Sequence, residues 1–172
     1  PAYLAREATR FLRENKDRPF ALYINFLEPH MPFFGPRDDQ YDPDALPLPG
    51  NFDDWPGPDQ PLKTRAFAAI YREQGHSGLP LKTDADWRRM EANYWGLNSL
   101  VDTHVGTILD ALEENGLADN TIVVYTSDHG DMMGSHHLLA KCVMFEEASR
   151  IPLLIRLPGQ NQQYRISGPV SQ

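Results

Sequence analysis

The sequence has 172 residues, long enough for one domain with a sizeable hydrophobic core. Apolar residues make up 41% and charged residues 23%, as is usual for a globular protein. The net charge of −8 argues against a basic face for nucleic acid, and no apolar stretch reaches the roughly 20 residues that span a bilayer. Cys142 is the single cysteine, which excludes an internal disulfide. The compartment (periplasmic, secreted or cytoplasmic) and the oligomeric state stay open.

The first half of the chain predicts a helix, a strand and a long excursion. Apolar residues recur at helical spacing over residues 2–15, which predicts an amphipathic helix. The run FALYINFL (residues 20–27) predicts a strand buried on both faces, as in a parallel sheet. Residues 33–82 hold eight of the 15 prolines, so we expect a surface excursion with a short helix at 62–72. Such excursions commonly shape a substrate pocket.

The second half predicts one long helix and two strands. The helical pattern returns over residues 84–115, and Asn115 with Gly116 supplies a stop. Apolar runs at 121–127 and 151–157 predict two further strands. The alternation of helix and strand is typical of an α/β fold with a mostly parallel sheet flanked by helices.

Polar side chains follow two of these strands at the points where they end. His30 closes the first strand's Glu-Pro-His turn, and Asp128 and His129 follow the second. Ligands bind beyond the carboxyl ends of strands in open α/β sheets, so we expect both groups at one rim. A neighbouring carboxylate and imidazole can share a divalent cation. The alternative is that Asp128 caps a following helix while His129 packs at the sheet edge.

Besides Asp128 and His129, four histidine and lysine side chains are candidates for chemistry. His30 can protonate a leaving group or bind an anion, or it can merely order its proline-rich turn. Lys141 can neutralise a developing oxyanion, which is worth about 3 kcal/mol for one such donor, or it can be an ordinary solvated lysine. Of His136 and His137 we expect at most one to face the pocket.

The remaining candidates are interpreted as structural. His76 and His104 are interpreted as surface or helix histidines. Cys142 lies in the apolar run KCVMFEE and reads as a small buried hydrophobe rather than a reactive thiol.

Three stretches, in this order, resemble the sulfatase family of the alkaline-phosphatase superfamily. They are RPFALYINFLEPHMPF, YWGLNSLVDTHVGTILDALEENGLADNTIVVYTSDHGDMMGSHHLLAK and FEEASRIPLLIRLPG. The long helix leading into DNTIVVYTSDHG, followed by Gly134, His136 and Lys141, is a specific combination. The proline-rich segment matches poorly.

The resemblance implies roles for five residues. Asp128 and His129 would complete a divalent-metal site, occupied by calcium in this family. His30 and Lys141 would be the catalytic pair that holds the sulfate group and the leaving-group oxygen. His136 matches a frequent Gly-x-His position, where we expect substrate binding. The implied substrate is a small-molecule or carbohydrate sulfate ester.

The nucleophile of the family is expected outside this chain. Sulfatases use a formylglycine made from Cys or Ser in a C/S-x-P-S-R motif, and that motif is absent from these residues. The paired aspartates that normally open the fold are missing too. We therefore expect residues 1–172 to be an internal, incomplete piece of a sulfatase catalytic domain, with 33–82 as an excursion and no turnover by itself. The alternatives are a phosphodiester or phosphonate monoester hydrolase of the same superfamily, or a non-catalytic remnant with a binding role.

Overall fold

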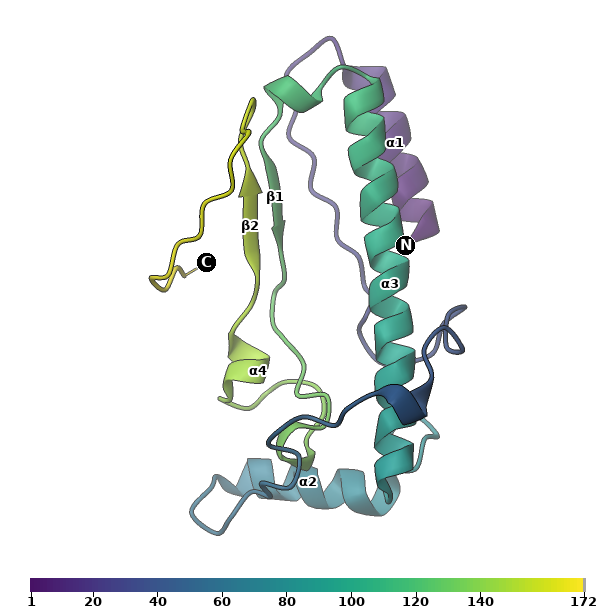
Figure 1. Ribbon diagram of the computed structural model, residues 1–172, viewed down its shortest axis with the longest axis vertical. Helices are drawn as coiled ribbons and strands as arrows, with labels where there is room; N and C mark the ends of the chain where they lie inside the picture. Colours follow the sequence, from purple (N-terminus) through teal and green to yellow (C-terminus); the bar gives the residue numbers. More distant parts are fainter. Residues whose placement is uncertain (172) are drawn as a thin grey trace.

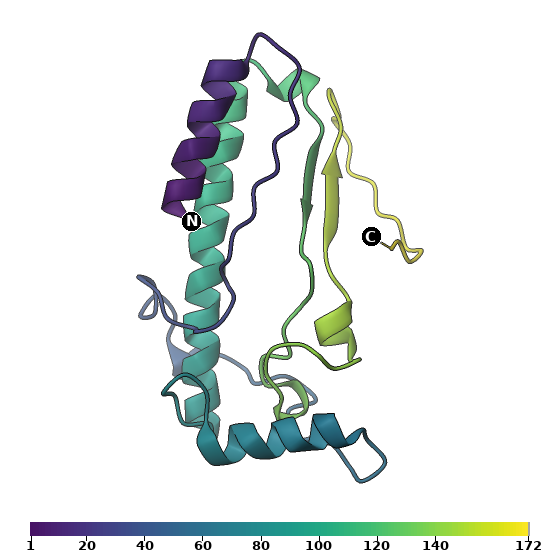
Figure 2. The ribbon, with the colours of Figure 1, turned by 180° about the vertical axis from the view of Figure 1, so that it is seen from behind.

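The computed structural model of the protein describes residues 1–171. Its longest element is α3 (Asp84–Glu114), and α1 (Ala2–Asn15) lies alongside the second half of α3 (Figure 1). Helix α2 (Leu62–Gln74) crosses the lower end of the molecule, as Figure 2 also shows from behind. All three predicted helices are therefore confirmed, with ends within two residues of expectation.

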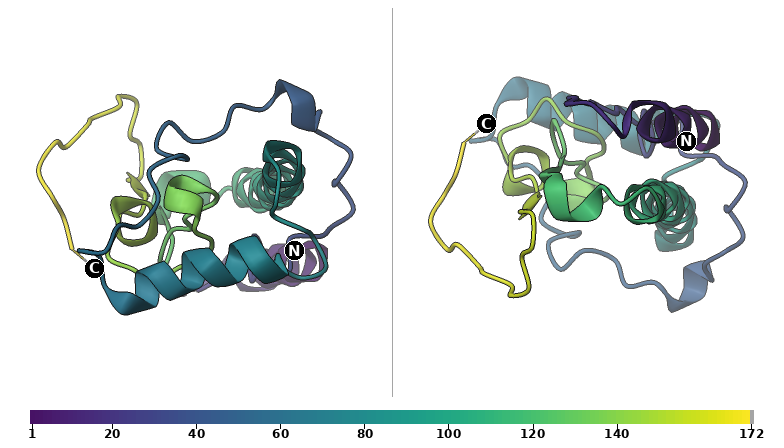
Figure 3. Two further views of the ribbon diagram at one scale, coloured as in Figure 1. Left: turned by 90° about the horizontal axis from the view of Figure 1, so that it is seen from below. Right: turned by 90° about the horizontal axis from the view of Figure 1, so that it is seen from above.

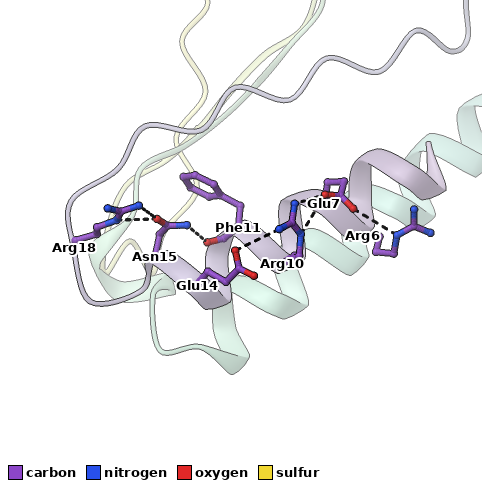
Figure 4. A network of polar contacts seen from close by, with 7 residues as sticks. All are labelled: Arg6, Glu7, Arg10, Phe11, Glu14, Asn15 and Arg18. Atoms are coloured by element: carbon purple, nitrogen blue, oxygen red, sulfur yellow. Dashed lines mark hydrogen bonds and ion pairs between the residues drawn. The ribbon is translucent and has the colours of Figure 1, made fainter.

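Helix α1 is amphipathic, as its spacing predicts. Leu12 is buried against Ala111 and Leu112 of α3, and this cluster joins the two helices. The opposite side of α1 carries a network of polar contacts (Figure 4), in which Arg10 donates to Glu7 at 2.5 Å. The ion pairs of Arg10 with Glu7 and Glu14 are exposed and contribute little to stability, whereas Asn15, which accepts from Arg18, is buried.

Helix α3 begins and ends at clear signals. The Thr83 hydroxyl and the Asp86 carboxylate cap each other's backbone N–H groups in a capping box. Gly116, with φ of 70°, follows the last turn and allows the left-handed exit. In the middle, a Cβ on Gly96 would lie 2.4 Å from the carbonyl oxygen of Arg37, so the excursion packs directly on the helix backbone.

The strands differ from the sequence expectation in direction and burial. β1 (Val123–Thr126) pairs antiparallel with β2 (Leu153–Arg156), with Val124 opposite Ile155. The connection between them contains the short helix α4 (Glu146–Ser149) and reverses the chain. The predicted parallel arrangement is therefore wrong for this pair, which forms the one sheet among residues 1–171.

Residues 20–27 are extended but belong to no ladder. Alternate side chains point inward, and Phe20 and Leu22 pack against the same cluster as Val123 of β1. The segment runs in the same direction as β1 in Figures 1 and 2, so both lead toward the lower end of the molecule. Tyr23 is 89% exposed, which corrects the expectation of a strand buried on both faces.

The excursion at 33–82 is packed rather than loose. It contains η1 (Pro43–Ala45) and α2. Arg37 donates to the Ser99 carbonyl at 2.7 Å and to Thr103 Oγ1 at 2.9 Å. Figure 3 shows the result along the long axis, with α2 crossing the end of the molecule below α3 and the strands. Among residues 1–171, no helix is both long and apolar enough to cross a membrane.

Candidate active site

The site lies where residues 20–27 and β1 both end. The first segment leads into His30, and β1 leads into a loop, residues 127–142, called here the site loop. Leu139 and Ala140 of the site loop share a buried cluster with Phe33, three residues after His30. The segment after His30 therefore meets the end of the site loop, although one of the two approaches to the predicted rim is not a paired strand.

His30 and Lys141 are in direct contact across 111 positions of sequence. Lys141 Nζ lies 2.6 Å from His30 Nε2. His30 sits between two cis peptide bonds, those preceding Pro29 and Pro32. The sequence thus correctly predicts that these two side chains converge.

The partners of the His30 ring fix its hydrogen positions. Nδ1 lies 2.8 Å from the carbonyl oxygen of Met31, which can only accept, so Nδ1 carries the hydrogen. Nε2 then accepts from the Lys141 ammonium, which can only donate. The pair places the Lys141 ammonium directly against the one ring nitrogen that can exchange a proton. An anionic group and a leaving oxygen are the chemistry that such a pair can serve.

Asp128 and His129 form a second pair. The Asp128 side chain is 84% exposed, and its Oδ2 lies 3.4 Å from His129 Nε2. Partial burial opposes the shift, but the charge of His129 and hydrogen bonds from its amide and from Ser127 hold the pKa of Asp128 below its ordinary value. Gly130 and the residues after it form an irregular loop, so the alternative in which Asp128 caps a helix is excluded.

The donor chemistry of this pair fits a cation. His129 Nδ1 lies 2.8 Å from the carbonyl oxygen of Gly130, so Nδ1 carries the hydrogen and Nε2 has a free lone pair. Nε2 lies 3.4 Å from Asp128 Oδ2, close enough for both atoms to bind one cation. Within residues 1–171, no group of three or more His, Cys, Asp or Glu side chains is gathered to hold a metal ion. The two residues therefore suit a cation site as two ligands of a larger shell.

A fourth residue of the site loop, Asp131, contributes to the site and was missed by the sequence reasoning. Its Oδ1 accepts the backbone N–H groups of Met133 at 3.1 Å and Ala140 at 2.9 Å. Burial raises the pKa of its carboxyl, while those two amides and the charge of Lys141 lower it. The one available signal was a carboxylate inside an otherwise apolar Gly-Asp-Met-Met turn.

His136 and His137 lie in η3 (Ser135–His137) and pack against the proline-rich excursion. His136 Nδ1 contacts the carbonyl oxygen of Asp54 at 2.9 Å, and Nε2 contacts Asn51 Nδ2 at 3.2 Å. His137 stacks on Trp55, with ring centroids 3.7 Å apart. Both rings thus tie the site loop to the excursion, and the substrate-binding role of His136 stays a prediction.

Two structural interpretations need correction. Cys142 is exposed rather than buried, because its φ of 75° turns it away while Phe145 packs inward. His76 is half-buried rather than on the surface. Its ring lies near Phe33 and Tyr71, its Nε2 is buried without a hydrogen-bond partner, and desolvation lowers its pKa.

Comparison with known proteins agrees with this geometry. The family model described as Sulfatase matches residues 2–172. The multifunctional alkaline phosphatase superfamily protein PehA of Trinickia caryophylli is 32% identical over 93% of this chain and 33% of its own length. Iduronate 2-sulfatase of Mus musculus is 32% identical over 94% of this chain and 31% of its own. The structure of the phosphonate monoester hydrolase SpPMH from Silicibacter pomeroyi superposes with a TM-score of 0.79 at 30% sequence identity. The match covers 92% of this chain and 32% of SpPMH.

The similarity to these proteins over most of its length places the chain in the alkaline-phosphatase superfamily. The chain belongs to the sulfatase family. It spans about a third of the length of the relatives it matches.

Proposed function

We propose that the protein containing this chain hydrolyses sulfate esters. The observation that carries the proposal is the contact of 2.6 Å between Lys141 Nζ and His30 Nε2 at the strand-end rim. It gathers a fixed positive charge and a proton-exchanging group at one point. Together with family membership, this is the chemistry that a tetrahedral anion with an alcohol leaving group requires.

In this proposal the two residues divide the work. Lys141 binds the sulfate oxygens, whose negative charge grows as the bond from sulfur to the ester oxygen breaks. His30 hydrogen-bonds the ester oxygen through Nε2, because Nδ1 is held by the Met31 carbonyl. For this step Nε2 must carry the second ring proton, so His30 acts as an imidazolium. When the bond breaks, that proton passes to the departing alcohol oxygen and leaves a neutral ring whose Nε2 accepts from Lys141.

Asp128 and His129 are proposed to hold a divalent cation, calcium by family resemblance, through one carboxylate oxygen and Nε2. Such a cation, when bound, supplies positive charge to the sulfate oxygens. A formylglycine from outside residues 1–172 is proposed as the nucleophile. The alcohol portion is proposed to be a carbohydrate or small molecule, in line with the name of iduronate 2-sulfatase, and the excursion at 33–82 is proposed to contact it.

A second candidate is a phosphonate monoester hydrolase. It is favoured by the superposition on SpPMH, a phosphonate monoester hydrolase, with a TM-score of 0.79. Sulfate esters and phosphonate monoesters both present tetrahedral anions of similar size, so His30 and Lys141 suit either group.

The test compares both substrates on the whole protein. We expect turnover of an activated aryl sulfate with a kcat/KM above that for the matched aryl phosphonate monoester. A reversed ratio would replace the first proposal by the second. Absence of turnover on both esters would contradict both candidates, provided that the nucleophile is fully converted to formylglycine and calcium is added.

A further inference from the structure

The site loop is closed at its neck by the Asp131 carboxylate. Oδ1 accepts hydrogen bonds from the backbone amides of Met133 and Ala140, and the amide of Met132 donates to the carbonyl of Ala140 at 2.9 Å. These bonds join the two ends of a ten-residue stretch, 131–140. Lys141 is the next residue after the closure, so its backbone position depends directly on this neck.

The loop needs such a constraint because its backbone is strained. Between residues 133 and 142, five residues other than glycine have positive φ, listed with their values as Met133 (36°), His136 (56°), His137 (54°), Ala140 (60°) and Cys142 (75°). Each such residue costs on the order of 1–2 kcal/mol and persists only where surrounding contacts enforce it. Ala140, held by Asp131, is one of them and directly precedes Lys141.

The Asp131 side chain is half-buried and lies close to charged groups of the site. Lys141 and His129 both act electrostatically on it. On its other side, the carboxyl is near Tyr71 of α2 and Tyr94 of α3. Burial first, and the Asp131 charge second, raise the pKa of both tyrosines, that of Tyr94 to about 12. The charge of Asp131 is therefore felt by side chains of both helices, while its hydrogen bonds are made within the loop.

We propose that Asp131 is a positioning residue, which holds Lys141 against His30 by binding the Met133 and Ala140 amides through Oδ1. The inference rests on the proposed function of the His30–Lys141 pair. It assigns Asp131 no contact with substrate. Its effect on turnover is transmitted through Lys141.

Two substitutions separate the hydrogen bonds from the rest of the side chain. Asp131→Asn keeps an Oδ1 that can accept both amides, whereas Asp131→Ala removes it. On the whole protein with an activated aryl sulfate, we expect Asp131→Ala to lower kcat by about 10²-fold with a much smaller change in KM. Asp131→Asn should stay within a few-fold of the unsubstituted protein. Asp119→Ala, an exposed aspartate in the short helix η2 (Ala118–Asn120) between α3 and β1, is the matched control.

A double-mutant cycle shows whether Asp131 acts through Lys141. If it does, Asp131→Ala should cost little further activity in a Lys141→Met background. Fully additive losses would overturn the proposal, as would an Asp131→Asn variant as impaired as Asp131→Ala.

Hydrogen exchange at the Ala140 amide gives a readout independent of turnover. The amide should be protected in the unsubstituted protein and in Asp131→Asn, and should exchange at least about tenfold faster in Asp131→Ala. If the protein cleaves neither ester, the proposed function fails, while this exchange pattern still supports the loop closure by Asp131. Fast exchange in Asp131→Asn or in the unsubstituted protein would overturn the positioning role even if turnover is seen. If Asp131→Ala does not fold, the exchange rate of the Ala140 amide in Asp131→Asn still tests the proposal.

Discussion

Helix α3 and the site loop meet in one buried cluster but differ in backbone conformation. In α3, 31 residues form a regular helix that begins at the Thr83 capping box and ends before Gly116. In the site loop, five residues other than glycine adopt positive φ within ten positions. Trp87 and Met90 of α3 nevertheless pack in the same cluster as Leu139 of the loop.

The difference indicates a division between framework and site. Local strain is tolerated where side chains must be aimed at a reacting group, and the regular element beneath supplies the stability that holds it. Substitutions in the site loop should therefore change binding and turnover more than stability. Substitutions in α3 should do the reverse.

The largest expected effect is that of Lys141→Met on the whole protein. Removing the ammonium should lower kcat by about 10²–10³-fold, or about 3–4 kcal/mol, because the charge that develops on the sulfate oxygens loses a donor. KM should change much less, and the midpoint of thermal unfolding should stay within a few degrees. Lys82→Met, at an exposed position just before α3, is the control. A Lys141→Met variant with unchanged kcat would break the assignment of this side chain to the site.

On the framework side, Glu91→Gln should produce a stability effect that depends on pH. Glu91 is buried on α3, and burial raises the pKa of its carboxyl to about 7 from 4.5, against an opposing effect of Arg88. The folded state therefore binds the proton more tightly, so stability falls as pH rises from about 4.5 to 7 and stays low above. The shift corresponds to at most about 3 kcal/mol.

Urea unfolding at pH 4.5 and pH 8 measures this effect. Glu91→Gln should gain little at pH 4.5 and up to about 3 kcal/mol at pH 8, with kcat unchanged. Glu114→Gln, exposed on the same helix, should not alter the pH dependence. If both variants respond alike, the raised pKa of Glu91 is wrong.

In the site loop, Asp128→Ala tests whether Asp128 is a metal ligand. Loss of one carboxylate should weaken divalent-metal binding by at least about tenfold, because the cation depends on a few charged oxygens. Metal content after dialysis and kcat should fall together, and excess calcium should restore part of the activity. Asp102→Ala, exposed on α3, serves as the control. Full metal occupancy in Asp128→Ala would exclude this residue as a ligand.

The sequence predicts the framework better than the sheet. Helical periodicity is local, so α1, α2 and α3 follow from the spacing of apolar residues and from stops such as Gly116. Strand pairing depends on partners distant in sequence, so the periodicity of residues 20–27 and 153–156 gave no information on direction or burial. The convergence of His30 and Lys141 was predictable because it needs only the shared rim.

The support of the site was harder to predict than its charged groups. Asp131 acts through backbone amides in a loop of positive φ, and neither the amides nor the φ values leave a pattern in the sequence. Cys142 was assigned to the core because its neighbours are apolar, but one left-handed residue reverses the direction of its side chain. The sequence carries no signal for such a reversal.

The smallest expected effect concerns the start of α3. Thr83→Ala removes the hydroxyl that accepts from the Asp86 amide, while the reciprocal bond from Asp86 to the Thr83 amide can remain. Loss of one N-cap acceptor typically costs about 1 kcal/mol of stability. Thr107→Ala, an exposed position within α3 whose hydroxyl bonds only back to the Thr103 carbonyl, should be neutral or slightly stabilising. Because Thr83 lies on the framework, kcat should be unchanged in both variants, and urea unfolding followed by circular dichroism should show the loss. A fall in kcat for Thr83→Ala without a fall in stability would mean that the helix start serves the site directly, and the division between framework and site would not hold there.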